Sequence, residues 1–177
     1  HLLDLVVSSG KHAGEIVAGV LNAFNPATPP GPVRPIGPAL AEALQAVRAT
    51  LPAGVQLFET IDLQADVQVL PGEMLQVASN LVSNAVRAMD GHGTMEVALA
   101  IDAAGTTLLS FKDDGPGMSE AIRGHAPEPF VTGRSGGNGL GLSIVAGIVQ
   151  KWGGDLRIVS APGVGTTISI SIAPPPT

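Results

Sequence analysis

The sequence predicts an α/β (α+β) two-layer sandwich, in which a mixed, mostly antiparallel sheet carries helices on one face. The first observation is the order of segments: pairs of strand-like segments joined by short turns alternate with single helical segments. Short turns favour antiparallel pairing, whereas a doubly wound parallel sheet needs a long crossover after each strand. The second observation is that the helical segments each carry one apolar face, as helices that cover a sheet do.

The composition is that of one folded domain, or of one domain with a short appendage. The chain has 177 residues, of which 45% are hydrophobic and 14% charged, so it can bury a sizeable core and is not typical of a disordered chain. A net charge of -6 argues against nucleic acid as a partner. The lack of Cys excludes disulfides and thiolate metal sites. The apolar runs are too short to span a membrane.

Residues 1–37 lie outside the predicted sandwich. Leu2 to Phe24 has helical periodicity with several glycines, which indicates a helix that packs on another helix. Residues 25–37 are rich in proline and predict a linker. The first residue is not Met, so we expect the sequence to be a fragment of a longer protein.

Periodic segments in the rest of the chain predict three helices, over Pro38–Thr50, Glu73–Met89 and Leu140–Trp152. Strand patterns fall between and after them, over Gly54–Ile61, Val67–Leu70, Met95–Ile101, Thr107–Asp113, Leu156–Ser160 and Thr166–Ile172. The apolar stripe of the last helix is expected to consist of Leu140, Ile144, Ile148 and Trp152. Residues 118–138 have no periodicity, and such a long loop in a compact domain is typical of a lid.

The sequence DDGPG at residues 113–117 follows a strand directly. Leu109, Phe111 and Asp113 share parity in that strand, so the Asp113 carboxylate should point inward with the buried side chains. Thr166 should point inward by the same argument in the last strand. A carboxylate in an apolar slot can accept a charge-assisted hydrogen bond from the amino group of a base. Asp and Gly are also ordinary turn residues, and this motif alone is more often a turn.

Two further motifs suit a metal and a phosphate. Asn80, Asn84 and Arg87 share a helix face that differs from the apolar stripe. An amide oxygen suits magnesium and an Arg can reach a phosphate, although a solvated helix face is the plain alternative. The cluster GNGLG at residues 137–141 opens a helix, where backbone N–H groups can hold a phosphate. It is not a P-loop, because no Gly-Lys-Ser/Thr follows.

Together and in this order, these motifs resemble the ATP-binding catalytic domain of sensor histidine kinases, in the group that includes gyrase, a class of heat-shock chaperones and a mismatch-repair ATPase. The segment QVASNLVSNAVRAM (76–89) resembles the N box, DDGPGM (113–118) the first glycine box and GNGLGL (137–142) the second. The segment EPFVT (128–132) resembles the phenylalanine-containing box of the lid, and GVGTT (163–167) the last glycine–threonine element. The resemblance covers roughly residues 38–173.

The resemblance implies a site for ATP and Mg²⁺. It implies that Asn84 binds the metal and that Asn80 lies near the phosphates, both as catalytic residues. It implies that Asp113 binds the adenine amino group with the help of Thr166, and that residues 118–138 form the ATP lid. The other implied ATP contacts are Arg87, Gly115, Gly117, Arg134, Gly137, Gly139, Leu140 and Gly141.

Three positions depart from the family pattern. Pro127 stands where the lid usually has its first Phe, and Asn138 replaces the usual Thr. Asn80 stands where gyrase-like ATPases have a Glu that activates water. Without that base, the domain is expected to hydrolyse ATP poorly and to present the γ-phosphate to another nucleophile.

The resemblance also implies a domain layout. Residues 1–24 would end the second helix of a dimerisation and phosphoacceptor domain, residues 25–37 would be the linker and residues 38–174 the catalytic domain. His12 does not resemble the acceptor because no acid follows it directly, so the acceptor His is expected before residue 1 and the fragment alone should not autophosphorylate.

The implied partners are the phosphoacceptor domain, a response regulator and a second copy bound through the helical domain, in the cytoplasm. Full-length protein could be membrane-anchored. The alternatives are an anti-sigma-factor serine kinase of the same fold, a degenerate nucleotide-binding module that only mediates interactions, and a gyrase-like clamp.

Overall fold

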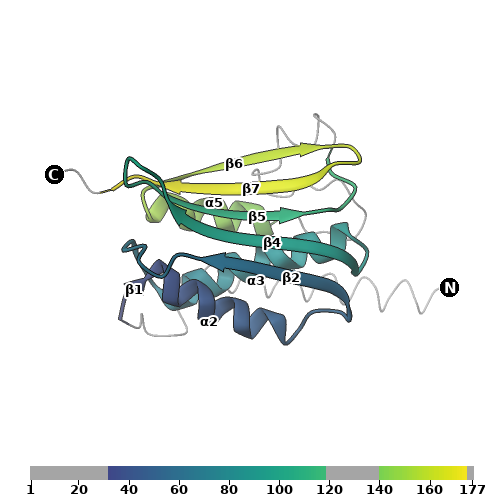
Figure 1. The fold of residues 1–177 in the computed structure, drawn as a ribbon, viewed down its shortest axis with the longest axis horizontal. Coiled ribbons are helices and arrows are strands. Elements are labelled where there is room, and N and C mark those ends of the chain that lie inside the picture. The colour runs from purple at the N-terminus through teal and green to yellow at the C-terminus, as the bar shows by residue number, and fades with distance from the viewer. Residues whose placement is uncertain (1–31, 119–139, 175–177) are drawn as a thin grey trace.

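The computed structural model describes residues 32–118 and 140–174 (Figure 1). The elements follow in the order β1 (Arg34–Pro35), α2 (Ile36–Arg48), β2 (Gly54–Ile61), β3 (Gln68–Val69), α3 (Pro71–Ala88), β4 (His92–Ile101), β5 (Thr107–Asp113), α5 (Gly141–Lys151), β6 (Gly154–Ala161) and β7 (Gly165–Ile172). The predicted N-terminal helix, nearly all of the lid and most of the linker lie outside the described residues. No helix in the described ranges is long and apolar enough to cross a bilayer.

A five-stranded sheet forms one layer, and α2, α3 and α5 cover one face of it (Figure 1). The strand order is β2-β4-β5-β7-β6, in which β2 and β4 run parallel and the other neighbours antiparallel. The parallel pair follows from α3, because a helix between two strands returns the chain to the end at which the first strand began. The predicted two-layer fold with a mixed, mostly antiparallel sheet is confirmed.

Alternation along β5 and β7 decides which side chains enter the core. The buried residues of β5 are Thr107, Leu109, Phe111 and Asp113. Those of β7 beyond its first glycine are Thr166, Ile168, Ile170 and Ile172. The register of the two strands places Asp113 opposite Thr166. The prediction that both side chains point inward is therefore confirmed.

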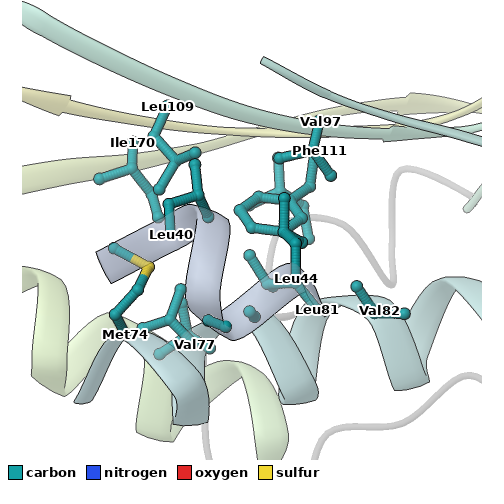
Figure 2. Close-up of a cluster of buried hydrophobic side chains, with 14 of the residues drawn as sticks. Leu40, Leu44, Met74, Val77, Leu81, Val82, Val97, Leu109, Phe111 and Ile170 are labelled. Atoms are coloured by element: carbon teal, nitrogen blue, oxygen red, sulfur yellow. The ribbon is translucent and has the colours of Figure 1, made fainter. Parts of the chain in front are cut away.

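The hydrophobic core fills the space between the sheet and the helices (Figure 2). The helices contribute Leu40 and Leu44 from α2 and Met74, Val77, Leu81 and Val82 from α3, all nearly without exposed surface. The sheet contributes Val97, Leu109, Phe111 and Ile170 to the same cluster. Because apolar burial stabilises by about 25 cal/mol per Å², this layer contact is the main source of the free energy that holds the helices on the sheet.

Several predicted boundaries were wrong. Helix α2 begins at Ile36 and not at Pro38, and α3 begins at Pro71 and not at Glu73. Proline fits the first turn of a helix because the N–H that it lacks has no partner there. The short strand β3 pairs with β1 outside the main sheet. Ile101, the last residue of the predicted strand Met95–Ile101, is 39% exposed because β4 ends at this residue.

The stripe predicted for the last helix was also wrong in part. The buried residues of α5 are Leu142, Val145, Ile148 and Val149, whereas Ile144 and Trp152 are half-buried beside them. Steps of four residues advance by about 400°, so a stripe built from three such steps drifts by about 120° around the helix. A stripe that alternates steps of three and four stays on the core face.

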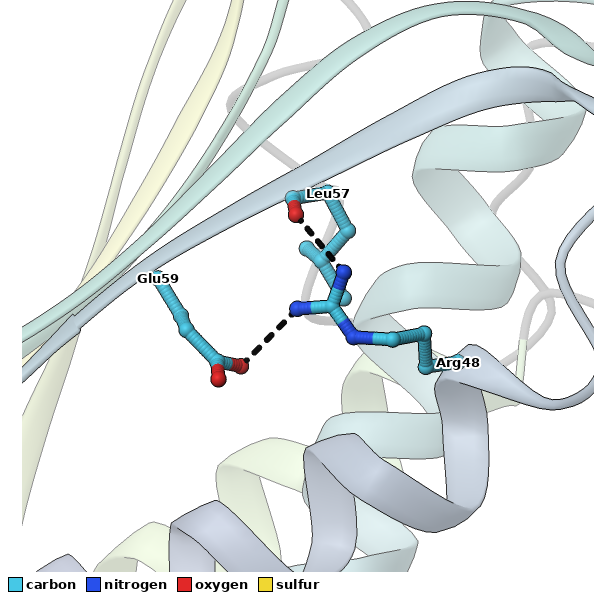
Figure 3. A network of polar contacts seen from close by, with 3 residues as sticks. All are labelled: Arg48, Leu57 and Glu59. Carbon is cyan, nitrogen blue, oxygen red and sulfur yellow. Dashed lines mark hydrogen bonds and ion pairs between the residues drawn. The ribbon is translucent and has the colours of Figure 1, made fainter.

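Arg48 ties the end of α2 to β2, which is an edge strand of the main sheet (Figure 3). Its guanidinium donates to the Leu57 carbonyl at 3.0 Å and to Glu59 Oε2 at 3.2 Å. The ion pair is exposed and contributes at most about 1 kcal/mol. Its second effect is to occupy a backbone acceptor of an edge strand, which lowers the capacity of that edge to pair with another chain.

Adjacent leucines of β5 provide a matched test of the layer arrangement. Leu109 is 1% exposed and contacts the core, whereas Leu108 is 41% exposed on the opposite face. We expect Leu109→Ala to lower the free energy of unfolding by about 2–5 kcal/mol and Leu108→Ala by less than about 1 kcal/mol. Urea unfolding of both variants measures the difference. Equal losses would contradict the assignment of the two sheet faces.

Candidate functional site

Asp113 lies at the end of β5 on the helix-covered face and is 8% exposed. Its Oδ1 accepts hydrogen bonds from the backbone N–H groups of Gly115, at 3.0 Å, and Thr166, at 3.3 Å. Both of these bonds end on the same oxygen. Within the described residues Oδ2 receives no hydrogen bond, so it is the oxygen that can accept one from a ligand.

Burial raises the pKa of Asp113, because the charged form loses hydration. The two backbone N–H groups lower the pKa and offset part of this effect, while the neighbouring charge of Asp114 adds to the rise. The buried, charged carboxylate therefore lowers the stability of the folded state. A poorly hydrated acceptor of this kind binds a matching donor more strongly than an exposed carboxylate does.

A hydroxyl pair lies beside Asp113 at the ends of β6 and β7. Ser160 Oγ is 3.0 Å from Thr166 Oγ1, donates to the Gly165 carbonyl at 2.9 Å and accepts from the Met118 N–H at 2.8 Å. Ser160 was not predicted from the sequence. Its signal was parity, since Ser160 follows Leu156 and Ile158 on the inner face of its strand as Thr166 and Asp113 do on theirs. The inner face of the sheet thus ends in three polar side chains.

Glycines let two backbone segments approach at this corner. A Cβ at Gly165, where φ is +94°, would overlap the Asp113 carbonyl, and one at Gly117, where φ is +70°, would overlap the Ala161 carbonyl. A Cβ at Gly115 would lie 2.8 Å from Asp113 Oδ1. The family resemblance predicts that Gly115 and Gly117 contact the nucleotide. The structure shows a further reason why position 117 is a glycine, which is that its loop packs closely on the β6–β7 turn.

The second half of the site lies on the C-terminal half of α3. Asn84 Oδ1 accepts a hydrogen bond from Arg87 Nη2 at 2.8 Å. Asn80 Nδ2 is buried and has no hydrogen-bond partner among the described residues. A Cβ added to Gly141, at the start of α5, would lie 3.5 Å from Asn80 Oδ1 and 3.6 Å from Asn84 Nδ2. The structure therefore brings Asn80, Asn84 and Gly141 together. Leu140 directly precedes Gly141 in the chain.

These groups fit a phosphate with a hard cation. A buried N–H without a partner is costly, and an anionic oxygen would satisfy that of Asn80. Amide oxygens are ligands that Mg²⁺ accepts, and Asn84 presents one, which is bonded to Arg87 in the ligand-free domain. The N-terminus of α5 adds its dipole at the same place. Arg134, Gly137 and Gly139, also predicted here, lie outside the described residues.

Helix α3 joins the two halves into one site. A Cβ at Gly115 would lie 3.4 Å from Met89 Cγ and 3.5 Å from Ala88 Cβ, so the end of α3 contacts the Asp113 loop. Ala88 follows Asn84 by one helical turn. A ligand lying along this stretch of α3 would meet the buried carboxylate at one end and the Asn pair at the other.

A two-layer α/β sandwich with a buried carboxylate at a strand end and two amide side chains on the adjacent helix suits a nucleotide-binding domain. Residues 70–176 match the family described as Histidine kinase-, DNA gyrase B-, and HSP90-like ATPase. The chain belongs to this family, and it is an ATP-binding domain of the sensor histidine kinase type. The resemblance seen in the motifs is thereby confirmed.

The chain is similar to curated sensor proteins, among them a sensor histidine kinase. The chain is 38% identical over 130 residues to the virulence sensor protein BvgS of Bordetella bronchiseptica, and the match covers 67% of this chain and 10% of that protein. It is 32% identical over 113 residues to the sensor histidine kinase ZraS of Escherichia coli, and that match covers 64% of this chain and 24% of that protein. The chain thus spans a tenth to a quarter of these relatives.

The fold matches a solved structure of the same kind. The mycobacterial sensor histidine kinase MprB superposes with a TM-score of 0.67 at 27% identity, over 79% of this chain and 95% of that chain. The two-layer arrangement of sheet and helices is therefore that of a histidine kinase ATPase domain.

The raised pKa of Asp113 makes a signed prediction for stability. The folded state holds this proton more tightly than the unfolded state, so stability falls as the pH rises from below the ordinary Asp range through the raised pKa. Asp113→Asn lacks this proton uptake. We expect the unfolding free energy of Asp113→Asn, relative to wild type, to increase across this window and then to level off.

Urea unfolding as a function of pH measures this difference. Asp155→Asn is the matched control, because Asp155 is an exposed residue of β6. Its difference from wild type should not follow the same curve. A constant difference for Asp113→Asn across the window would contradict a raised pKa.

Two glycines of α5 separate binding from helix stability. Nothing lies within 4 Å of a Cβ at Gly147, so Gly147→Ala should raise the free energy of unfolding by about 0.5–1 kcal/mol without changing nucleotide affinity. Gly141→Ala places its methyl group against Asn80 and Asn84 without a clash. We expect it to keep stability and to weaken binding of an ATP analogue by about five- to tenfold. Calorimetric titration and urea unfolding measure the two effects, and unchanged affinity in Gly141→Ala would contradict the assignment.

Proposed function

We propose that this domain binds Mg-ATP and delivers the γ-phosphoryl group to a histidine of a helical domain in the same signalling protein. The observation that carries the proposal is the position of the two halves of the site along α3. Asp113 offers an unused carboxylate oxygen at one end, and Asn80, Asn84 and Gly141 meet at the other. ATP has an amino group at one end and phosphates at the other, so its chemistry matches both.

Recognition of the base would rest on Asp113. Its Oδ2 would accept a hydrogen bond from the adenine amino group, with the Thr166 hydroxyl beside it. A guanine has a carbonyl at the equivalent ring position, which would place two acceptors against each other. The carboxylate therefore favours adenine over guanine.

Recognition of the phosphates would rest on α3 and the start of α5. The buried Nδ2 of Asn80 would donate to a phosphate oxygen, Arg87 would supply positive charge and the N–H groups near Gly141 would add theirs. Asn84 would hold the cation, for which Arg87 has to release its Oδ1. When bound, Mg²⁺ neutralises charge on the phosphates that the amides cannot.

Transfer to histidine fits the side chains of the site. Position 80 carries an amide and not a carboxylate, so it cannot deprotonate a water molecule, and hydrolysis should be slow. In the proposed transfer a histidine ring nitrogen forms the new bond to phosphorus, the bond to the bridging oxygen of ADP breaks, and ADP leaves. The chain positions the nucleotide, and the acceptor supplies the nucleophile.

The remaining parts of the proposal concern the whole protein. Residues 1–24 would end the acceptor domain, residues 25–37 would link it to the catalytic domain at residues 38–174, and the helical domains of two copies would pair. A response regulator would then take the phosphoryl group from the histidine in the cytoplasm. The name of one relative, the sensor histidine kinase ZraS, supports the histidine step of this proposal.

Calorimetric titration with a non-hydrolysable ATP analogue and Mg²⁺ tests the binding step. We expect wild type and the control Asp155→Asn to bind, and Asp113→Asn to bind at least about tenfold more weakly, because a charge-assisted bond is lost. A GTP analogue should bind weakly to all three. A folded wild type that binds neither nucleotide would overturn the proposal and leave a module that mediates interactions only.

Phosphoryl transfer is tested separately in the full-length protein with labelled ATP. Label that is lost in acid and kept in alkali identifies phosphohistidine. Label that survives acid would indicate a serine kinase of the same fold and would contradict the histidine step while leaving ATP binding intact.

A further inference from the structure

A polar contact joins the far ends of α3 and α5, away from the proposed phosphate site. The indole Nε1 of Trp152, which caps α5, donates to Glu73 Oε2 at 2.9 Å. Lys151 Nζ lies 3.4 Å from the other oxygen of the same carboxylate. The Glu73 side chain is 20% exposed and that of Lys151 is 70% exposed. The indole bond is therefore the better shielded of the two contacts and the one that resists salt and water.

The geometry makes α3 and α5 an antiparallel pair whose members meet at both ends. Glu73 precedes Asn84 by 11 residues, and Gly141 precedes Trp152 by 11 residues (84 minus 73 and 152 minus 141). Eleven residues of helix span about 16 Å. Glu73 meets Trp152 at one end, and Gly141 meets Asn80 and Asn84 at the other. Because α5 moves along its axis as a rigid helix, an axial slide at Trp152 moves Gly141 by the same distance.

Between these two ends, the buried side chains of α5 are aliphatic. The buried face of α5 consists of Leu142, Val145, Ile148 and Val149. Aliphatic packing is favourable but non-directional. Among the described residues, the side-chain hydrogen bonds that cross from α5 to α3 both end on Glu73. Among these side-chain hydrogen bonds, the directional constraint on the position of α5 along α3 therefore comes from one carboxylate.

We infer that Glu73 is a positioning residue for the phosphate end of the ATP site. Through its bond to the Trp152 indole, it sets the axial register of α5 and so the distance of Gly141 from Asn80 and Asn84. It touches neither nucleotide nor metal. The inference rests on the proposed function for its meaning in binding, whereas the register itself is a property of the ligand-free domain.

The plain alternative is that Glu73 only stabilises the fold. It lies in the first turn of α3, where an acidic side chain favours the helix dipole. A merely structural role predicts that removal of the carboxylate lowers stability and leaves the relative affinities for different ligands unchanged. A positioning role predicts that the phosphates lose affinity and the base does not.

The test compares an ATP analogue with Mg²⁺ against adenosine, on variants of the full 177-residue chain. The affinity for adenosine reports on binding at Asp113 alone. The affinity for the ATP analogue also includes the contacts of its phosphates with Asn80, Asn84 and Gly141. We expect Glu73→Ala and Trp152→Phe to weaken binding of the analogue about tenfold and to leave adenosine binding unchanged. Trp152→Phe keeps an aromatic ring and removes only the N–H donor, so it guards against loss of packing.

Two conservative variants should retain the analogue affinity. Glu73→Gln keeps an amide oxygen that can accept from the indole, and Lys151→Ala removes only the exposed ion pair. Wild-type affinity in Glu73→Ala and Trp152→Phe, or equal losses for analogue and adenosine, would overturn the inference.

An NMR measurement decides the question without nucleotide. The chain has one Trp, so a single indole N–H resonance reports the contact directly. In ligand-free Glu73→Ala we expect shifts of that resonance and also of the Gly141 amide and the side-chain amides of Asn80 and Asn84. Shifts confined to the neighbourhood of Glu73 would overturn the register argument. If wild type bound neither ligand, the proposed function would fail, and these spectra would still test the register on their own.

Discussion

The placement of a carboxylate on the core face of the sheet is the constraint on which the site depends. Asp113 needs donors at that depth, and the chain supplies the N–H groups of Gly115 and Thr166. The second donor requires β7 to run beside β5 in one register, with Thr166 opposite Asp113. It also requires glycine at position 165, because any Cβ there would overlap the Asp113 carbonyl. The end of the central strand β5 and the start of its neighbour β7 are thus organised around one acid.

Most of the fold could be predicted because it follows from local periodicity. Strand β2 has the predicted bounds, and the parity of β5 and β7 predicted the direction of Asp113 and Thr166 correctly. Parity is strict in a strand because side chains alternate without drift. Helix faces were less predictable, because a stripe of residues spaced four apart drifts around the helix, as the error in the α5 stripe demonstrates. The starts of α2 and α3 were predicted two residues late, although proline is compatible with a first turn and α3 begins on one.

The site was predictable to the extent that its residues stand in motifs. Asn80, Asn84 and the glycine at position 141 were marked by spacing, and the structure brings them together. Ser160 and Glu73 were not marked, because their partners lie far away in the sequence or in another element. Glu73 and Trp152 are 79 positions apart in the sequence, and no sequence pattern between them predicts a contact. Such contacts depend on how α3 and α5 pack, which periodicity alone does not determine.

The two halves of the site are held by different physics. Among the described residues, both hydrogen-bond donors to Asp113 belong to the sheet or to the loop that follows β5, and these directional backbone bonds fix the acceptor in place. At the other half, Gly141 reaches the Asn pair through two helices whose common surface is aliphatic. Under the proposed function, the Asp113 corner would recognise the base and the helix pair would place the phosphates. The Glu73 carboxylate at the far end of the pair would act on that placement through α5, because a helix transmits axial displacement along its length.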